Sequence, residues 1–273
     1  MWTASVCVWL SPPRSRSTKL KTLSSLIFAR ARRTIRTVMY EQQLRAHLPR
    51  VQDRIARAME RAHRTQQVRI IAVTKGHPAA AVQAAVAAGL RDCGENRVAE
   101  LESKIEVLGR GAARWHLIGH LQRNKVRKAI PLFDVVHSID SLRLAQELSA
   151  EAGRAGETVT GFVQVNASGE EAKSGIDVAT DLVPGLEAVQ AISELPHLRI
   201  SGVMTMAPYI ADERILRNTF AQTRKLFDLC AGRVSNFHAE HVSMGMSNDF
   251  EIAIEEGSTM VRLGTILFGE RTQ

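Results

Sequence analysis

The sequence contains few cysteines and no long apolar run. Its three cysteines, Cys7, Cys93 and Cys230, have neither the pairing of a disulfide framework nor the spacing of zinc ligands. No segment approaches the roughly 20 apolar residues that a membrane-spanning helix needs. These absences argue against a disulfide-rich secreted domain and against a transmembrane protein. We therefore expect a protein of a reducing compartment, the cytoplasm.

Acidic residues are absent from residues 1–38, which contain eight of the 36 lysines and arginines. The other 28 basic residues balance the 28 acidic ones, so 39–273 is formally neutral and the net charge of +8 comes from this extension. A surface for nucleic acid is therefore not indicated. We expect 1–38 to be a disordered extension, or to lie upstream of a true start at Met39. Its Ser-, Thr- and Arg-rich composition is also that of an organelle transit peptide, which is the alternative.

Short β-rich runs alternate with helical patterns through 39–273. An amphipathic helix runs from Met39 to about Arg64. Eight strands are predicted at 69–75, 90–96, 115–120, 134–140, 159–166, 198–206, 239–245 and 259–269. Helices are predicted at 78–88, 97–108, 122–130, 141–152, 178–194, 212–230 and 248–256. This alternation predicts one α/β domain, a parallel (β/α)8 barrel of TIM type.

An open doubly wound sheet is the competing fold. It usually carries a glycine-rich turn after its first strand, and the turn here, Lys75-Gly76-His77-Pro78, has no Gly-x-Gly-x-x-Gly. The barrel is therefore favoured.

Functional groups of such a barrel belong at the carboxyl ends of its strands. Lys75 ends the first strand, and Arg262 lies inside the apolar eighth strand. A strand-end lysine alone usually marks the edge of the solvent, and the arginine has a simpler explanation as the partner of Asp140 or Glu95.

The segment 243–249 combines small residues with a helix start, where backbone N–H groups and the helix dipole favour an anion. Helix capping explains it equally well. His116 and His120 are four residues apart, but WHLIGH predicts a strand and turn rather than a zinc-binding helix, so no metal is expected.

An amine, an anion site and a buried arginine on one rim suggest pyridoxal 5′-phosphate (PLP). The amine of Lys75 would condense with the aldehyde, and Arg262 would donate to the pyridine nitrogen. A Schiff-base aldolase for a phosphorylated sugar uses the same parts without a cofactor and stays open.

Eight motifs carry a resemblance to a known family. They are AVTK (72–75), GEN (94–96), WHLIGHLQRNK (115–125), SID (138–140), KSGI (173–176), GVMTM (202–206), SMGMSND (243–249) and GSTMVRLGTILFGER (257–271). In this order and spacing they resemble the pyridoxal phosphate homeostasis proteins (the YggS/PROSC family), relatives of the alanine racemase N-terminal barrel. The resemblance covers about Met39 to Gly269. Arg97 stands where relatives often have an aromatic residue, so the outer edge of the pocket differs.

The resemblance implies a protein of intracellular PLP homeostasis that holds PLP as an internal aldimine on Lys75 and delivers it to apo-enzymes. The other implied cofactor-binding residues are Asn96, His116, Asn166, Met204, Ser243, Met244, Gly245, Arg262, Gly264 and Thr265. Of these, the phosphate would be bound by Ser243, Gly245, Gly264 and Thr265. Lys173, in KSGI, is a candidate second amine near the mouth, although a solvated loop lysine is the simpler explanation.

A carrier is favoured over an enzyme. An arginine partner leaves the pyridine nitrogen unprotonated, which makes the ring a weaker electron sink. A racemase also needs a second base, commonly a tyrosine from another domain, and the sequence has two tyrosines, Tyr40 and Tyr209, and ends at Gln273. We therefore expect a monomeric PLP-binding protein with no nucleic-acid or membrane partner. A PLP-dependent racemase-type enzyme is the alternative.

Overall fold

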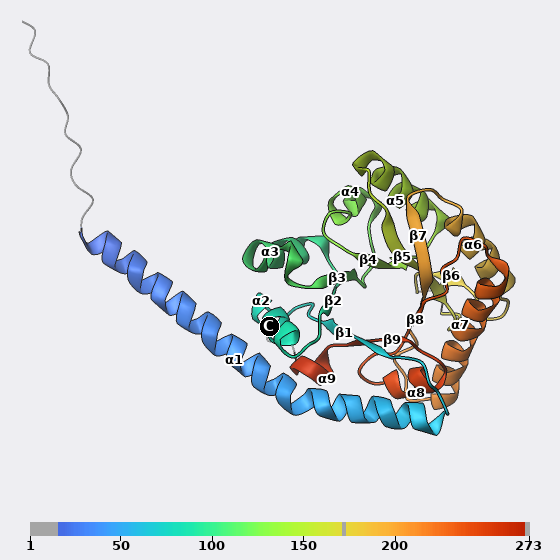
Figure 1. The fold of residues 1–273 in the computed structure, drawn as a ribbon, viewed down its shortest axis with the longest axis horizontal. Helices are drawn as coiled ribbons and strands as arrows, with labels where there is room; N and C mark the ends of the chain where they lie inside the picture. Colours follow the sequence, from blue (N-terminus) through green and yellow to red (C-terminus); the bar gives the residue numbers. More distant parts are fainter. Residues whose placement is uncertain (1–15, 171–172, 271–273) are drawn as a thin grey trace, which may run out of the picture.

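Eight parallel strands form a closed ring in the computed structural model, which describes residues 16–170 and 173–270, with side chains from Thr37 onward. The strands are β1 Arg69–Val73, β2 Asp92–Glu95, β3 Arg114–Leu117, β4 Val135–Ile139, β5 Val159–Asn166, β7 Leu198–Met204, β8 His241–Ser243 and β9 Met260–Leu263. Their order is β4-β3-β2-β1-β9-β8-β7-β5, and pairing of β4 with β5 closes the ring (Figure 1). The predicted (β/α)8 barrel is confirmed. A short strand that was not predicted, β6 Ile176–Asp177, pairs with β5.

Helices cover the outside of the ring (Figure 1). They are α2 Ala79–Ala87, α3 Val98–Leu108, α4 Val126–Ala129, α5 Leu142–Ala155, α6 Val183–Ser193, α7 Glu213–Arg233, α8 Phe250–Glu255 and α9 Thr265–Phe268, with 3-10 turns η1 Arg110–Ala112 and η2 Arg123–Lys125. The predicted eighth strand was too long: it ends at Leu263, and Gly264 turns the chain into α9. A short apolar run does not by itself distinguish a strand from a buried helical turn.

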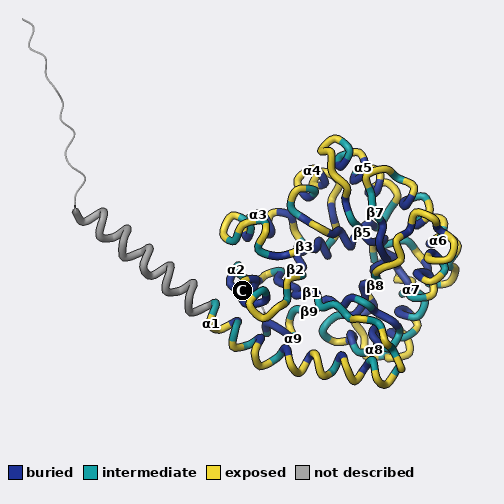
Figure 2. Tube along the Cα trace, viewed as in Figure 1, coloured by how far each residue is buried: buried dark blue, intermediate teal, exposed yellow. Residues whose placement is uncertain are grey.

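The barrel is filled by side chains. A cluster of Ile71, Val135, Phe162, Met204 and Met260 occupies its interior, and each of these residues is buried. The larger apolar core lies between the strands and the helices, while exposed residues lie mostly on the outer sides of the helices (Figure 2). Burial of each large apolar side chain contributes about 1.5–3 kcal/mol. The interior is therefore a packed core, and a ligand has room only at its ends.

Helix α1, Arg16–Arg61, begins within the predicted extension and packs against α2, α8 and α9 (Figure 1). Leu44, Leu48, Val51 and Ile55 are buried, as their helical spacing predicts. The backbone of 16–38 continues this helix, whereas 1–15 lie outside the described residues. The domain boundary at 38/39 stays a prediction. None of the helices in the described part of the chain is both long and apolar enough to cross a membrane.

Candidate functional site

A cavity of about 450 Å³ opens where β1 and β9 end. Its wall is formed by Val73, Lys75, His77, Ile118, Met206, Tyr209, Met246, Ser247, Asn248, Asp249, Arg262, Gly264, Thr265 and Glu270. Four predicted site residues are thus brought together, namely Lys75, Arg262, Gly264 and Thr265. The carboxyl ends of barrel strands meet at one rim, which is why residues so far apart in the sequence line one cavity.

Lys75 lies on a tight turn directly after β1. Gly76 follows with φ +74°, a left-handed conformation that favours glycine. The His77 N–H closes the turn on the Thr74 carbonyl at 3.0 Å. The buried His77 ring also lies with its Nδ1 3.1 Å from the Tyr40 hydroxyl of α1. The turn is therefore anchored to the barrel and to α1, which holds Lys75 at the cavity.

Arg262 reaches the cavity from β9 and is 4% exposed. Its Nη1 donates to the Ser243 carbonyl and hydroxyl, both at 2.8 Å, and its Nη2 donates to the Thr205 carbonyl at 2.9 Å. Burial lowers the pKa of Arg262 to about 10, although the charge of Asp249 raises it in part. The guanidinium is thus protonated at neutral pH and acts only as a donor.

The alternative partners considered for Arg262 lie elsewhere. Glu95 Oε1 accepts a hydrogen bond from Lys104 Nζ at 2.5 Å. Asp140 Oδ2 lies 3.0 Å from His120 Nδ1. A pairing of Arg262 with either carboxylate was therefore the wrong hypothesis.

A hydrogen-bonded column runs from Arg262 through the barrel interior. Ser243 Oγ lies 3.0 Å from His137 Nδ1, His137 Nε2 lies 2.9 Å from His116 Nδ1, and His116 Nε2 lies 2.9 Å from Asp92 Oδ1. Because the Ser243 hydroxyl accepts from Arg262, its proton is directed to His137. His137 then donates to His116, and His116 donates to Asp92, which when ionised can only accept. Both imidazoles are therefore neutral and carry their proton on Nε2.

The electrostatics agree with these assignments. Burial lowers the pKa of His137 well below its ordinary value, and burial also lowers the pKa of His116 despite the nearby Asp92 carboxylate. Burial acts to raise the pKa of Asp92, but the hydrogen bond from His116 and the charges of Arg69 and Arg114 act against it, and this pKa is lowered overall.

These two buried imidazoles predict a pH-dependent stability. His116 and His137 stay neutral in the fold because burial lowers their pKa values, whereas histidines of the unfolded chain take up a proton as pH falls through about 6.5. The free energy of unfolding is therefore not reduced by these histidines above that pH, and it decreases as the pH falls below it. Between about pH 7.5 and 5.5, each fully buried histidine is expected to lower the free energy of unfolding by up to about 1.4 kcal/mol.

Urea unfolding at both pH values measures this loss. His137→Gln replaces one titrating ring with an amide, so the loss should be smaller in the variant. An unchanged pH dependence in His137→Gln would contradict the assignment of His137 as neutral.

The column places two predicted site residues below the cavity rather than on its wall. The side chains of Ser243 and His116 are both fully buried, and the hydroxyl of Ser243 is engaged by Arg262 and His137. Met204 belongs to the interior cluster and Met244 to the outer core. Their roles in cofactor binding stay predictions.

Three further predicted residues shape loops around the rim. Asn166 donates to the Glu170 carbonyl at 2.9 Å and accepts from Ser168. Asn96 lines a neighbouring hollow and packs against Gly119, where a Cβ would lie 2.6 Å from Asn96 Cβ. Gly245 has φ +95°, and a Cβ there would lie 2.7 Å from that of Ala253 on α8.

Sequence reasoning missed several residues of the cavity wall. Asn248 and Asp249 were considered only as part of a helix start, and Tyr209 only in the tyrosine count. Ser247 follows β8 among the small residues of 243–249, so its position was signalled by composition. Met206 ends the predicted strand 198–206, whereas no pattern in the sequence indicates that Glu270 lines the cavity.

The candidate second amine, Lys173, lies on the loop after β5. Its Nζ pairs with Glu170 Oε2 at 2.6 Å and approaches the carbonyl of Met206, a residue of the cavity wall, at 3.5 Å. Lys173 is therefore close to the cavity while being held by an ion pair.

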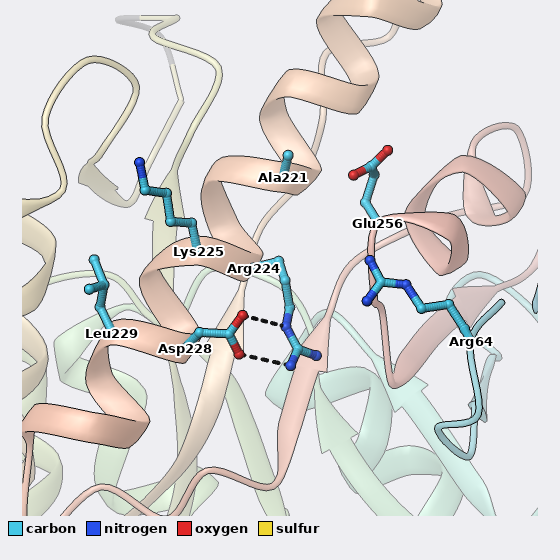
Figure 3. Close-up of a pocket in the computed structure, with 7 residues that line it drawn as sticks. All are labelled: Arg64, Ala221, Arg224, Lys225, Asp228, Leu229 and Glu256. Atoms are coloured by element: carbon cyan, nitrogen blue, oxygen red, sulfur yellow. Dashed lines mark hydrogen bonds and ion pairs between the residues drawn. The ribbon is translucent and has the colours of Figure 1, made fainter. Parts of the chain in front are cut away.

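Another hollow, of about 380 Å³, lies beside α7 (Figure 3). Most of its charged side chains have partners: Arg224 pairs with Asp228 at 2.8 Å, Arg64 donates to the Glu255 carbonyl at 3.0 Å, and Glu256 pairs with Arg217 at 3.0 Å. These contacts explain the hollow as a paired polar surface, and we assign no function to it.

Comparison with known proteins identifies relatives that cover most of the chain. The model of the alanine racemase N-terminal domain matches residues 46–272. A pyridoxal phosphate homeostasis protein of Aquifex aeolicus is 38% identical over 82% of this chain and 96% of its own length. That of Pseudomonas aeruginosa is 41% identical over 82% of this chain and 94% of its own length.

Among solved structures, PipY of Synechococcus elongatus with PLP bound has a TM-score of 0.68 at 36% identity, over 79% of this chain and 100% of that one. The resemblance predicted from the motifs is confirmed. The chain belongs to the pyridoxal phosphate homeostasis protein family, within the group that shares the alanine racemase N-terminal domain.

Proposed function

We propose that this protein binds PLP in the cavity at the end of β1 and β9, with Lys75 as the covalent attachment point, and that it serves PLP homeostasis. The observation that carries the proposal is that an amine and a buried guanidinium, protonated at neutral pH, line the same cavity. A relative with PLP bound, 36% identical over most of this chain, supports it.

The residues of the cavity fit the cofactor. A volume of about 450 Å³ lies within the usual range of small-molecule sites, about 300–1,000 Å³. Val73, Ile118 and Met246 offer apolar surface for a ring. Gly264 and Thr265 are at the start of α9, and the Thr265 N–H precedes the first hydrogen bond of the helix, from the Leu267 N–H to the Gly264 carbonyl at 2.8 Å, so this end of the helix suits the phosphate.

PLP, when bound, supplies an aldehyde that condenses with a primary amine. Lys75 would supply that amine, and the condensation would release the aldehyde oxygen as water. Arg262, fixed by Ser243 and Thr205, would be the hydrogen-bond donor to the ring nitrogen and would keep its proton. Because Arg262 does not give up that proton, the ring is a poor acceptor of electrons, which suits storage better than carbanion chemistry.

The tyrosines support a carrier rather than a racemase. Tyr40 is buried and does not line the cavity; its hydroxyl lies 3.1 Å from Nδ1 of His77, a residue of the cavity wall. Tyr209 does line the cavity, and this is the observation that favours the racemase-type alternative; however, it is 89% exposed, which is a poor setting for a positioned base. Delivery to apo-enzymes, the monomeric state and the cytoplasmic location stay predictions.

Transfer measurements separate the two functions. Purified protein is loaded with PLP, freed of excess cofactor by gel filtration, and mixed with an apo-enzyme that needs PLP. We expect the apo-enzyme to regain activity, and we expect no racemisation when the loaded protein is incubated with a panel of L-amino acids. Turnover of any amino acid without recovery of the apo-enzyme would favour the racemase-type enzyme.

A further inference from the structure

A lysine is buried on the inner face of α3. Lys104 is 5% exposed and follows Val98 and Leu101 on the face that packs against the barrel. Lysine is almost never buried unless its ammonium is paired. Lys104 also lies outside the wall of the cavity, so ligand contact does not explain its burial.

The Lys104 ammonium joins three oxygens. It donates to Glu95 Oε1 at 2.5 Å, to Glu100 Oε1 at 3.0 Å and to the Thr74 carbonyl at 2.8 Å. We call Glu95, Glu100 and Lys104 the α3 clamp. It connects the end of β2 and the helix α3 with the residue that precedes Lys75.

The two carboxylates of the clamp also hold the turn that carries Lys75. Thr74 Oγ1 donates to Glu95 Oε1 at 2.5 Å, and the Gly76 N–H donates to Glu100 Oε1 at 2.6 Å. The residues immediately before and after Lys75 are therefore both fixed by the clamp, Thr74 through its carbonyl and hydroxyl and Gly76 through its amide.

The charges of the clamp make a purely stabilising role a weak explanation. Burial raises the pKa of Glu95, and its Oε2 has no hydrogen-bond partner within the described residues. Burial also acts to raise the pKa of Glu100, but the hydrogen bonds from Lys104 and the Gly76 amide lower it overall. Removing such charges from water offsets much of their attraction, so a buried ion pair adds little net stability. What it does supply is a fixed geometry.

We infer that Lys104, through the α3 clamp, is a positioning residue that fixes the turn on both sides of Lys75 and so directs the Lys75 amine into the cavity. This inference deepens the proposed function and rests on it. Lys104 makes no contact with the cofactor in this scheme. It acts on the condensation at Lys75, and not on the phosphate or ring-nitrogen contacts that Arg262, Gly264 and Thr265 provide.

Two ligands separate these contributions. Pyridoxine 5′-phosphate has an alcohol where PLP has the aldehyde, so it can use the phosphate and ring contacts but cannot condense with Lys75. For Lys104→Met we expect PLP affinity to fall about tenfold or more, since small misplacements of a reacting group have large effects. Affinity for pyridoxine 5′-phosphate should stay within about twofold, because its contacts are untouched. The matched control is Lys173→Met, which removes the ammonium of a second ion-paired lysine, one that is partly buried, and should change neither affinity.

A second measurement needs no cofactor. The Gly76 amide is held by Glu100, so its hydrogen exchange should be slow in the apo-protein and faster in Lys104→Met. Because Lys104→Met leaves Glu95 buried without its cation, the double variant Lys104→Met/Glu95→Gln is prepared in parallel, since removing both partners costs less than removing one. The same affinity pattern is expected from it.

Equal weakening of both ligands, or no weakening of either, would overturn the positioning role of Lys104. A different result would contradict the proposed function. If the unaltered protein binds PLP no better than pyridoxine 5′-phosphate, the covalent site itself is wrong.

Discussion

Lys75→Ala is expected to lose the ability to retain PLP through gel filtration. The structure offers one described lysine on the wall of the cavity, and its removal leaves the ligand only the contacts of Arg262 and of the turn at Gly264 and Thr265. In Lys75→Ala, the covalent bond between the protein and PLP is thus replaced by non-covalent contacts, from which PLP can dissociate. Absorbance in the violet range and the PLP content of the protein fraction measure the loss, which should approach complete.

The matched control is Lys173→Ala. Lys173 is the other lysine close to the cavity, with its Nζ 3.5 Å from the Met206 carbonyl, but it is paired with Glu170 at 2.6 Å. We expect this variant to keep its absorbance and its PLP content. Retained cofactor in Lys75→Ala together with loss in Lys173→Ala would transfer the covalent role to Lys173.

Arg262→Leu is expected to have the second largest effect, because it acts on both binding and stability. The substitution removes the donor from the Thr205 carbonyl and from the Ser243 hydroxyl, while the Ser243 carbonyl keeps the Thr205 N–H at 3.1 Å. Each buried group that loses its donor costs about 1–3 kcal/mol. The substitution also removes the donor for the ring nitrogen. We therefore expect the free energy of unfolding to fall by about 2–5 kcal/mol, and affinity to fall for PLP and pyridoxine 5′-phosphate alike.

Urea unfolding and titration with both ligands measure these effects. Arg262→Lys keeps a charge but not the planar fork that bonds Ser243 and Thr205 at once, so it should recover only part of the loss. The control is Arg214→Leu, whose side chain is 92% exposed and whose loss should change stability by at most about 0.5 kcal/mol. If Arg262→Leu weakened PLP while pyridoxine 5′-phosphate bound normally, the assignment of Arg262 to the ring nitrogen would be wrong.

These two variants and Lys104→Met have different expected signatures. Loss of Lys75 or of Lys104 should reduce the advantage of PLP over pyridoxine 5′-phosphate, whereas loss of Arg262 should weaken both ligands. The difference follows from where each side chain is proposed to act: Lys75 would react with the ligand, Lys104 would fix the turn that carries Lys75, and Arg262 would contact the part that the two ligands share.

The sequence predicted the barrel because its pattern repeats eight times. Each repeat pairs a short apolar run with an amphipathic one, and parallel strands place all carboxyl ends at one rim. This single geometric fact was enough to bring Lys75 and Arg262 together before any contact was known. The structure places both on the wall of one cavity.

The depth of a strand residue could not be predicted in the same way. His116, Met204 and Ser243 all lie near strand ends, but stagger between neighbouring strands decides which side chains reach the rim and which lie below it. Ser243 consequently supports Arg262 from beneath, and His116 continues the column toward Asp92. A sequence pattern gives the alternation of faces, not the height of each side chain in the barrel.

Lys104 was missed because its environment is tertiary. In the sequence it is one charged residue among others in ELESK, and helical spacing alone does not tell a paired buried lysine from a solvated one. Only the approach of Thr74, directly after β1, and of Glu95, at the end of β2, points to the role that we infer for it. In the sequence Lys104 cannot be distinguished from a surface lysine, so its burial on the inner face of α3 could not be predicted.

The most direct test of the central claim is reductive trapping followed by peptide mapping. The protein is loaded with PLP, treated with borohydride, digested, and sequenced by mass spectrometry to find the modified lysine. The account predicts one stoichiometric adduct, on the peptide that contains Lys75. An adduct on any other lysine, or none at all in correctly folded protein, would contradict it.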